Sequence, residues 1–332
     1  MDLVTGGTGI VGSHILEELT RNEKTVRAIK RVSSDINLVQ RVFEHYNNPN
    51  FNCIEWVLGD ITDIPSIEEA MVGIENVYHA AAIVSFNKKD RQQMHKINVE
   101  GTANIVNLCL ANNVKKLGYI SSIASLGRTA GQEWYSEKDT WKTSKQNSYY
   151  AITKYTAENE VWRGTEEGLE SVMVNPGVIL GPGEMHKSSG TLFGTIYKGL
   201  KYYTKGTNGF VDARDVSRSI IQLVTSDISK ERYLCVGENL PFKTFFELVA
   251  RSLNKTAPSK LAKPWLTGIA WRLVGLISFI TAKNPAITKE SVSTSHFINQ
   301  YNSDKLKQAI DFKFTPIEEA CKNTGAFFLK RK

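Results

Sequence analysis

Cysteine is scarce in this chain, and the few cysteines are too widely spread to form a metal-binding or redox motif. Four occur in 332 residues, with no CxxC pair and no Cys/His cluster (Cys53, Cys109, Cys235 and Cys321). A disulfide framework and a cysteine-ligated zinc site are therefore not expected, and we predict no bound metal. The scarcity favours a reduced chain in the cytoplasm. Because the chain opens directly on a short strand and a glycine loop, no signal peptide is expected.

Runs of positive charge are absent as well. The net charge is +7, but the lysines and arginines are scattered and do not interleave with aromatic residues. Nucleic acid is therefore not an expected partner. The mild positive excess suits an anionic small molecule, such as a dinucleotide phosphate. Internal repeats and low-complexity linkers are also lacking, which fits one large α/β unit or two closely packed lobes.

Only one long apolar run occurs, over residues 265–282 (WLTGIAWRLVGLISFITA), and it is at the short end for a membrane span. Gly268 and Gly275 interrupt it, and Arg272 is its single charge. We interpret the run as a helix or helix pair that covers a substrate pocket. Peripheral membrane contact and a true span are the weaker alternatives, because the apolar length does not clearly exceed the threshold.

The first 125 residues alternate between apolar strand patterns and helical patterns. Such alternation predicts a Rossmann-type, doubly wound α/β fold, in which helices cover both faces of a parallel sheet. Residues 176–332 are less regular and are predicted to form a smaller, mainly helical substrate-binding region with some segments returning to the core. Strands are expected at 3–4, 25–29, 53–58, 77–81, 117–121 and 171–174, and helices at 13–21, 67–72, 99–112, 150–163, 211–225 and 245–253.

Glycines recur at three-residue spacing in residues 5–12, which read TGGTGIVG. Gly6, Gly9 and Gly12 would allow a tight turn out of the strand, close approach of backbone to a pyrophosphate, and close packing of helix on strand. The loop directly follows an apolar strand and directly precedes an amphipathic helix, and this context separates it from a plain glycine turn. We therefore predict that residues 1–175 bind a dinucleotide, with its phosphates at the helix N-terminus.

The end of the second expected strand bears on which dinucleotide binds. NAD binding calls for an acidic residue about 20 positions after the glycines, to accept a hydrogen bond from the ribose 2′-hydroxyl. Lys30 and Arg31 stand there instead, followed by Ser33 and Ser34. Two cations would attract a 2′-phosphate, so the sequence favours NADP. NAD remains the alternative, in which both cations are simply solvated.

A candidate acid/base pair follows in the sequence YAITK, where Tyr150 and Lys154 are four residues apart and share one helix face. A nearby ammonium should lower the pKa of the phenol, which could then donate a proton to a carbonyl oxygen as hydride arrives. Ser121 and Ser122 end an apolar strand, and strand carboxyl ends face the ligand in such sheets. A hydroxyl there could bind the reacting oxygen.

Together these residues resemble the extended short-chain dehydrogenase/reductase superfamily, which includes the NAD-dependent epimerases and dehydratases. Matching motifs run in order through residues 3–225: TGGTGIVG, LGDITD at 58–63, HAAA at 79–82, NVEGT at 98–102, SS at 121–122 with Gly127, YAITK, and NPGVILGPG at 175–183. The resemblance selects Ser122 over Ser121, because the active serine lies five residues before that glycine. Thr153 departs from the usual serine, which should matter little.

The resemblance implies a catalytic set of Ser122, Tyr150 and Lys154. It also implies cofactor contacts in five of these motifs and at the end of the second expected strand, with Asp60 and the backbone of Ile61 beside adenine (Gly6, Thr8, Gly9, Ile10, Val11, Gly12, Lys30, Arg31, Asp60, Ile61, Ala80, Ala81, Ala82, Lys154, Pro176, Gly177 and Val178). Ala80–Ala82 would lie beside the cofactor ribose. Pro176–Val178 would contact the nicotinamide amide.

Within the superfamily, the chain looks most like dihydroflavonol reductases and 3β-hydroxysteroid dehydrogenases, through VRAIKR at 26–31, NPGVILGPG, and GFVDARDV at 209–216. This implies an NADP-dependent oxidoreductase acting on a carbonyl or secondary alcohol of a bulky apolar small molecule. A nucleotide-sugar epimerase or dehydratase with tightly bound NAD is the second interpretation. Against it, residues 208–210 (Asn-Gly-Phe) stand where epimerases usually carry Arg-Asp-Tyr. A non-catalytic dinucleotide-binding sensor is the third interpretation. The sequence is also compatible with a homodimer.

Overall fold

The computed structural model describes residues 1–263 and 295–330. The apolar run at 265–282 lies outside the described residues, so its function as a pocket cover stays a prediction. Within the described ranges, no helix is both long enough and apolar enough to cross a membrane.

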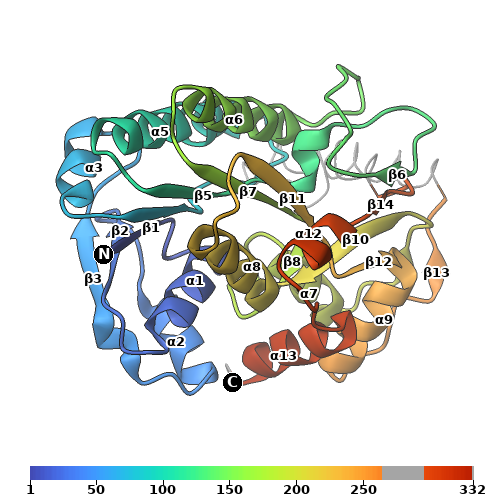
Figure 1. Ribbon diagram of the computed structural model, residues 1–332. Helices are drawn as coiled ribbons and strands as arrows, with labels where there is room; N and C mark the ends of the chain where they lie inside the picture. The colour runs from blue at the N-terminus through green and yellow to red at the C-terminus, as the bar shows by residue number, and fades with distance from the viewer. Residues whose placement is uncertain (264–294, 331–332) are drawn as a thin grey trace.

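A seven-stranded sheet forms the centre of the molecule (Figure 1). Its strands run in the order β11-β7-β5-β4-β1-β2-β3, and every neighbouring pair is parallel. Their bounds are β1 (Asp2–Thr5), β2 (Val26–Lys30), β3 (Ile54–Leu58), β4 (Asn76–His79), β5 (Lys116–Ile120), β7 (Ser171–Pro176) and β11 (Glu231–Cys235). The sheet confirms the predicted parallel α/β fold.

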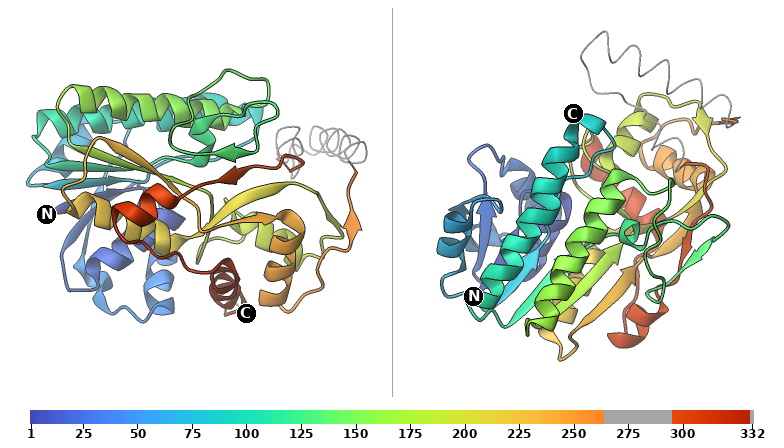
Figure 2. Two further views of the ribbon diagram at one scale, coloured as in Figure 1. Left: turned by 45° about the vertical axis from the view of Figure 1, so that its right-hand side comes forward. Right: turned by 90° about the horizontal axis from the view of Figure 1, so that it is seen from above.

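Helices cover the sheet on both faces, which is why its central strands are buried on both sides and nearly continuously apolar. The first face carries α1 (Ile10–Thr20), α2 (Asn37–His45) and α8 (Ala213–Thr225). The second carries α3 (Ile64–Met71), α5 (Gly101–Ala111) and α6 (Tyr149–Glu166). Viewed from above, α5 and α6 run side by side across that face (Figure 2).

A second, smaller sheet of β8 (Val178–Leu180), β10 (Thr207–Asp212) and β12 (Glu238–Pro241) lies beside the first. Three helices pack against it around a separate apolar core: α7 (Gly190–Tyr197), α9 (Phe242–Ser252) and α13 (Ile317–Leu329). Stacked rings of Phe210 and Phe245, with centroids 4.1 Å apart, form the centre of this core.

Short elements complete the described chain. Two small parallel pairs join segments distant in sequence, β6 (Trp134–Tyr135) with β14 (Gln300–Tyr301) and β9 (Tyr202–Tyr203) with β13 (Lys260–Leu261). The remaining helices are α4 (Arg91–His95), α12 (Asp304–Ala309), the 3₁₀ turns Asn50–Cys53, Lys88–Asp90 and Ile123–Leu126, and a π-helical turn at Lys96–Glu100.

The structure departs from the predicted elements mainly in the second half. There β8, β10, β11 and β12 were not anticipated, and β11 returns to the main sheet, where it pairs with β7. These strands are only three to six residues long, which is too short for an alternation of apolar and polar residues to be recognised in the sequence. In the first half, α1 begins at Ile10, three residues before the predicted start, because Gly9 is its N-cap.

Candidate active site

The glycine loop lies where the strand order of the main sheet reverses. From β1 the chain moves to β2 and β3 on one side and then crosses to β4 on the other side of β1. In open parallel sheets, ligands bind at such a switch point, beyond the carboxyl ends of the strands. Gly6 follows the end of β1, and Ala80 follows the end of β4. The predicted cofactor motifs therefore meet at one edge.

The backbone of this loop is shaped for a ligand that must approach closely. Gly6 has φ +69°, and a Cβ at this position would lie 2.6 Å from the backbone N of Ala81. A Cβ on Gly12 would lie 2.1 Å from the Gly6 carbonyl oxygen. Gly9, the N-cap of α1, has no side chain to cap the helix, so the N–H groups of the first turn remain available to an anion. These features fit the pyrophosphate of a dinucleotide.

Lys30 and Arg31 lie at the carboxyl end of β2, the strand next to β1 on the side away from β4. Arg31 is exposed and Lys30 is partly exposed. In the described part of the chain, neither side chain forms an ion pair. The following turn is closed by hydrogen bonds between Arg31 and Ser34. Both cations are thus free to meet a 2′-phosphate.

The other predicted cofactor residues also lie at strand carboxyl ends. Asp60 follows β3, and one of its carboxylate oxygens accepts hydrogen bonds from Thr62, at 2.9 Å from the backbone N and 2.8 Å from the hydroxyl. Ile61 is buried, and its carbonyl oxygen accepts a hydrogen bond from the side chain of Asn104. Pro176–Val178 spans the junction of β7 and β8.

Tyr150, at the start of α6, lies next to Ser122, which follows β5. Tyr150 lies in the first turn of this helix, which Ser148 caps by accepting a hydrogen bond from the backbone N of Ala151. Burial raises the pKa of the Tyr150 phenol, and a hydrogen bond with the Ser122 hydroxyl opposes that rise. Both side chains keep some exposure, so a bound substrate could reach them.

Ser121 is committed to a different group. Its hydroxyl donates to the Glu158 carboxylate at 2.5 Å, and the side chains of Ser125 and Asn175 donate to the same oxygen at 2.7 and 2.8 Å. Arg232 completes the cluster with a 2.8 Å ion pair to the other carboxylate oxygen. Sequence reasoning missed this buried cluster, although Glu158 follows Lys154 by one helical turn. It ties α6 to β5, β7 and β11 directly behind Ser122.

Lys154 points into the sheet and not toward the Tyr150 phenol. Its ammonium donates to the Tyr119 hydroxyl at 2.7 Å and to the Ile120 carbonyl oxygen at 2.9 Å. Burial lowers the pKa of Lys154 to about 7, and Glu158 opposes that fall. The expectation that Lys154 lowers the pKa of Tyr150 is wrong for this arrangement, because burial dominates and raises it.

Tyr119, which sequence reasoning did not single out, belongs to a buried polar chain beneath the site. Thr102 hydrogen-bonds Tyr119 and lies 3.0 Å from Nε2 of His79, whose Nδ1 lies 2.6 Å from the Thr5 hydroxyl. His79 also stacks on the Tyr119 ring. Burial lowers the pKa of His79 to about 3, so its ring is neutral. This chain connects Lys154 to the strand that precedes the glycine loop.

Hydrogen bonds from Asn98 hold the loop that follows β4 in place. The buried Asn98 side chain exchanges two hydrogen bonds with the backbone of Ile83 and donates to the Thr153 hydroxyl at 3.1 Å. Thr153, which stands where the usual serine would, accepts this hydrogen bond with its hydroxyl. The loop places Phe86, 37% exposed, with its ring centroid 6.4 Å from that of Tyr150.

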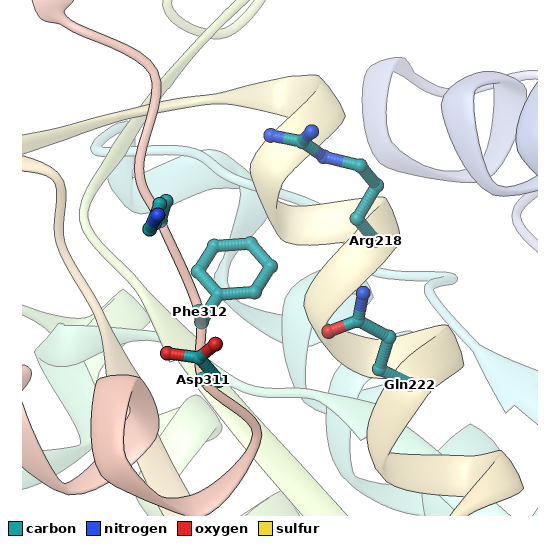
Figure 3. Close-up of a pocket in the computed structure, with 5 residues that line it drawn as sticks. Arg218, Gln222, Asp311 and Phe312 are labelled. Carbon is teal, nitrogen blue, oxygen red and sulfur yellow. The ribbon is translucent and has the colours of Figure 1, made fainter.

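A separate hollow of about 260 Å³ lies between α8 and the segment that follows α12 (Figure 3). Arg218, Gln222, Asp311 and Phe312 line it, together with Lys313. No residue of the glycine loop and neither Ser122 nor Tyr150 contributes to this hollow, so it is not the candidate active site.

A comparison with protein families agrees with this geometry. Residues 3–235 match the model described as the NAD dependent epimerase/dehydratase family. The chain belongs to this family. As a family member it is an NAD(P)-dependent enzyme of the extended short-chain dehydrogenase/reductase type, and the predicted resemblance is confirmed. The match ends at β11, the last strand of the main sheet.

Named relatives extend the likeness over 98–100% of the chain. Sterol demethylase protein B of Methylococcus capsulatus is 30% identical over 99% of this chain and 98% of its own length. A putative dihydroflavonol 4-reductase of Synechocystis sp. is 25% identical over 98% and 93%. The crystal structure of gox2253 superimposes with a TM-score of 0.81 at 27% identity, covering 100% of this chain and 98% of that one.

Proposed function

We propose that this protein is an NADP-dependent oxidoreductase that transfers hydride between the nicotinamide and a carbonyl or secondary alcohol of a bulky apolar substrate. The observation that carries the proposal is the partly exposed Tyr150 phenol, hydrogen-bonded to Ser122 at the carboxyl edge of the sheet. The glycine loop and Lys154 stand at the same edge. These positions support a dinucleotide on one side and a reacting carbonyl on the other.

The side chains divide the chemistry among them. Bound NADPH supplies the hydride, or NADP⁺ accepts it. Tyr150 donates a proton to the carbonyl oxygen during reduction and takes it back from the alcohol during oxidation. Because burial holds its pKa above the ordinary value, the phenol is protonated at neutral pH and ready to act as an acid. The Ser122 hydroxyl binds the same oxygen. We propose that Lys154, which the Tyr119 hydroxyl and the Ile120 carbonyl oxygen hold at the end of β5, contacts the ribose when the dinucleotide is bound.

Two observations support an apolar substrate. Phe86 is exposed beside Tyr150, where a large apolar side chain favours an apolar ligand. Phe210, in the run that replaces Arg-Asp-Tyr, is fully buried against Phe245 and cannot hold a phosphate. A nucleotide-sugar epimerase remains the alternative, and it would retain NAD through purification.

The deciding experiment follows NADPH absorbance at 340 nm with a panel of apolar ketones and aldehydes, beside NADH and UDP-glucose. NADPH oxidation with at least one carbonyl supports the proposal. Tyr150→Phe must abolish the signal, and Tyr149→Phe, the neighbouring tyrosine, must keep it. Protein that carries bound NAD and isomerises UDP-glucose without net oxidation would instead establish the epimerase.

A further inference from the structure

Among the described residues, Arg128 presents a cation without an ion-pair partner close to the candidate active site. Gly127 ends the 3₁₀ turn that begins directly after Ser122, and it has φ +72°, which favours glycine. A Cβ there would meet the ring of Trp141 at 3.0 Å. The chain reverses at this point, so Arg128 leaves the turn and its backbone N donates to the Asn147 side chain at 2.7 Å. Asn147 precedes Tyr150 by only three residues.

The guanidinium of Arg128 has no polar partner in the described part of the chain. Its Nη1 is buried without a hydrogen bond, and no carboxylate forms an ion pair with it. Aromatic rings surround it: its Cζ lies 5.5 Å from the centroid of the Phe297 ring, and Tyr135 and Tyr301 are close enough to influence its charge. The rings of these two tyrosines stack with centroids 5.5 Å apart.

The aromatic contacts do not satisfy this side chain. A ring below the guanidinium plane interacts with its charge, but the five N–H donors lie in the plane and need acceptors there. Burial also lowers the pKa of Arg128, which shows that its surroundings disfavour the cation. A buried charge without a partner is costly, and an anion that enters on binding would remove that cost.

We propose that Arg128 binds an anionic group of the substrate, a carboxylate or a phosphate. The substrate would then be an apolar molecule that carries this group within the length of an arginine side chain from its reacting carbonyl. The fork of N–H donors matches two oxygens of such a group, and the surrounding rings match its apolar body. The placement relative to the carbonyl rests on the proposed function. The anion site itself does not.

Binding measured without turnover therefore tests the site. The probes are 2-naphthoate, its methyl ester and 2-naphthyl phosphate, titrated calorimetrically into the full-length protein with and without NADP⁺. The acid should bind about 10- to 150-fold more tightly than the ester, the range expected for charge-assisted hydrogen bonds. Tighter binding of the phosphate than of the carboxylate also supports the site and assigns the acid as a phosphate.

Two variants complete the design. Arg128→Met should remove the preference for the acid, and Arg128→Lys should keep part of it. Arg251→Met, on the exposed face of α9, is the matched control and should leave the preference unchanged. Equal binding of acid and ester by the unmutated protein overturns the proposal, whether or not the variants fold. Intact naphthoate binding with no turnover of any carbonyl would reject the reductase and retain the anion site.

Discussion

Tyr150 is the residue on which the proposed chemistry depends, because its phenol is hydrogen-bonded to the Ser122 hydroxyl. Its neighbour Tyr149 offers the same phenol on the same helix, but the Arg91 guanidinium covers its ring. Comparing substitutions at Tyr149 and Tyr150 therefore tests whether the position of the tyrosine on α6 matters, and not only its presence.

Replacing Tyr150 with phenylalanine should reduce kcat by at least about 10²–10⁴-fold, because the proton donor is lost while the helix remains. NADPH binding, followed by fluorescence titration, should be unchanged. Tyr149→Phe should stay near the activity of the unmutated enzyme. Retention of more than about a tenth of the activity in Tyr150→Phe would place the acid elsewhere.

Lys30 and Arg31 are the residues that should choose between the two dinucleotides. Replacing both with alanine should remove most of an NADPH preference of about 1.5–3 kcal/mol, since each is proposed to make a charge-assisted contact to the 2′-phosphate. Dissociation constants for NADPH and NADH measure it. Lys322→Ala, an exposed cation on α13, is the control. Equal affinities of the unmutated protein for NADPH and NADH would show that Lys30 and Arg31 do not discriminate between the two dinucleotides.

The buried position of Lys154 has a consequence for stability against pH. Its pKa is about 7 in the folded chain and about 10.4 in the unfolded chain. Between these values the unfolded state binds more protons, so this group makes the free energy of unfolding rise with pH. Below about pH 7 both states hold the proton, and the cost of burying the ammonium is fully present.

Urea unfolding of the unmutated protein and of Lys154→Met should therefore diverge with pH. The difference should shift in favour of the unmutated protein between about pH 7 and 10, by up to about 1.4 kcal/mol per pH unit. Lys145→Met, at an exposed lysine before α6, should show no such trend. A constant difference over this range would mean that Lys154 keeps its proton.

At the scale of elements, the position of α6 depends on one carboxylate. Glu158 accepts hydrogen bonds from Ser121 directly after β5, from the 3₁₀ turn that follows and from β7, and it pairs with Arg232 of β11. Three strands and the catalytic helix thus meet at a group with 2% exposure. Removing its charge leaves the Arg232 guanidinium without its carboxylate in a largely buried place.

Glu158→Gln should lower the free energy of unfolding by about 3 kcal/mol, the low end for breaking a buried ion pair, because two carbonyl oxygens still accept from Arg232. Glu160→Gln, which breaks a partly exposed pair with Arg163 on the same helix, should cost no more than about 1 kcal/mol. Chemical denaturation compares the two. Similar losses in both variants would show that the cluster does not hold α6.

At the scale of the whole molecule, the dinucleotide should act as a stabilising ligand, because its predicted contacts extend from the end of β3 across the main sheet to β8 of the smaller sheet. At a concentration 100 times its dissociation constant, NADPH should add about 2.7 kcal/mol to the free energy of unfolding. NADH at the same concentration should add less. The Lys30→Ala/Arg31→Ala variant should show a much smaller difference between the two dinucleotides. If neither dinucleotide stabilised the unmutated protein, the cofactor assignment would be contradicted.

Local sequence was sufficient to predict the fold of the first half of the chain. The spacing of Gly6, Gly9 and Gly12 and the four-residue step from Tyr150 to Lys154 are properties of a single turn or helix, and short motifs encode them directly. The repeated alternation of strands and helices likewise predicted the parallel sheet, because each unit buries its own apolar face in a regular period. Assembly into a homodimer and a cytoplasmic location stay predictions.

The tertiary structure decided what those motifs touch. Tyr119 holds Lys154 from 35 residues away, and Arg232 meets Glu158 across 74. Arg128 is surrounded by rings from β6 and from the segment around β14. Such contacts form only when the sheet assembles. Hydrogen bonds and burial between residues distant in sequence produce no periodic pattern along the chain, so the sequence does not predict them. For the same reason the pKa of Tyr150 is set by the packing around it, and four-residue spacing from a lysine could not determine it.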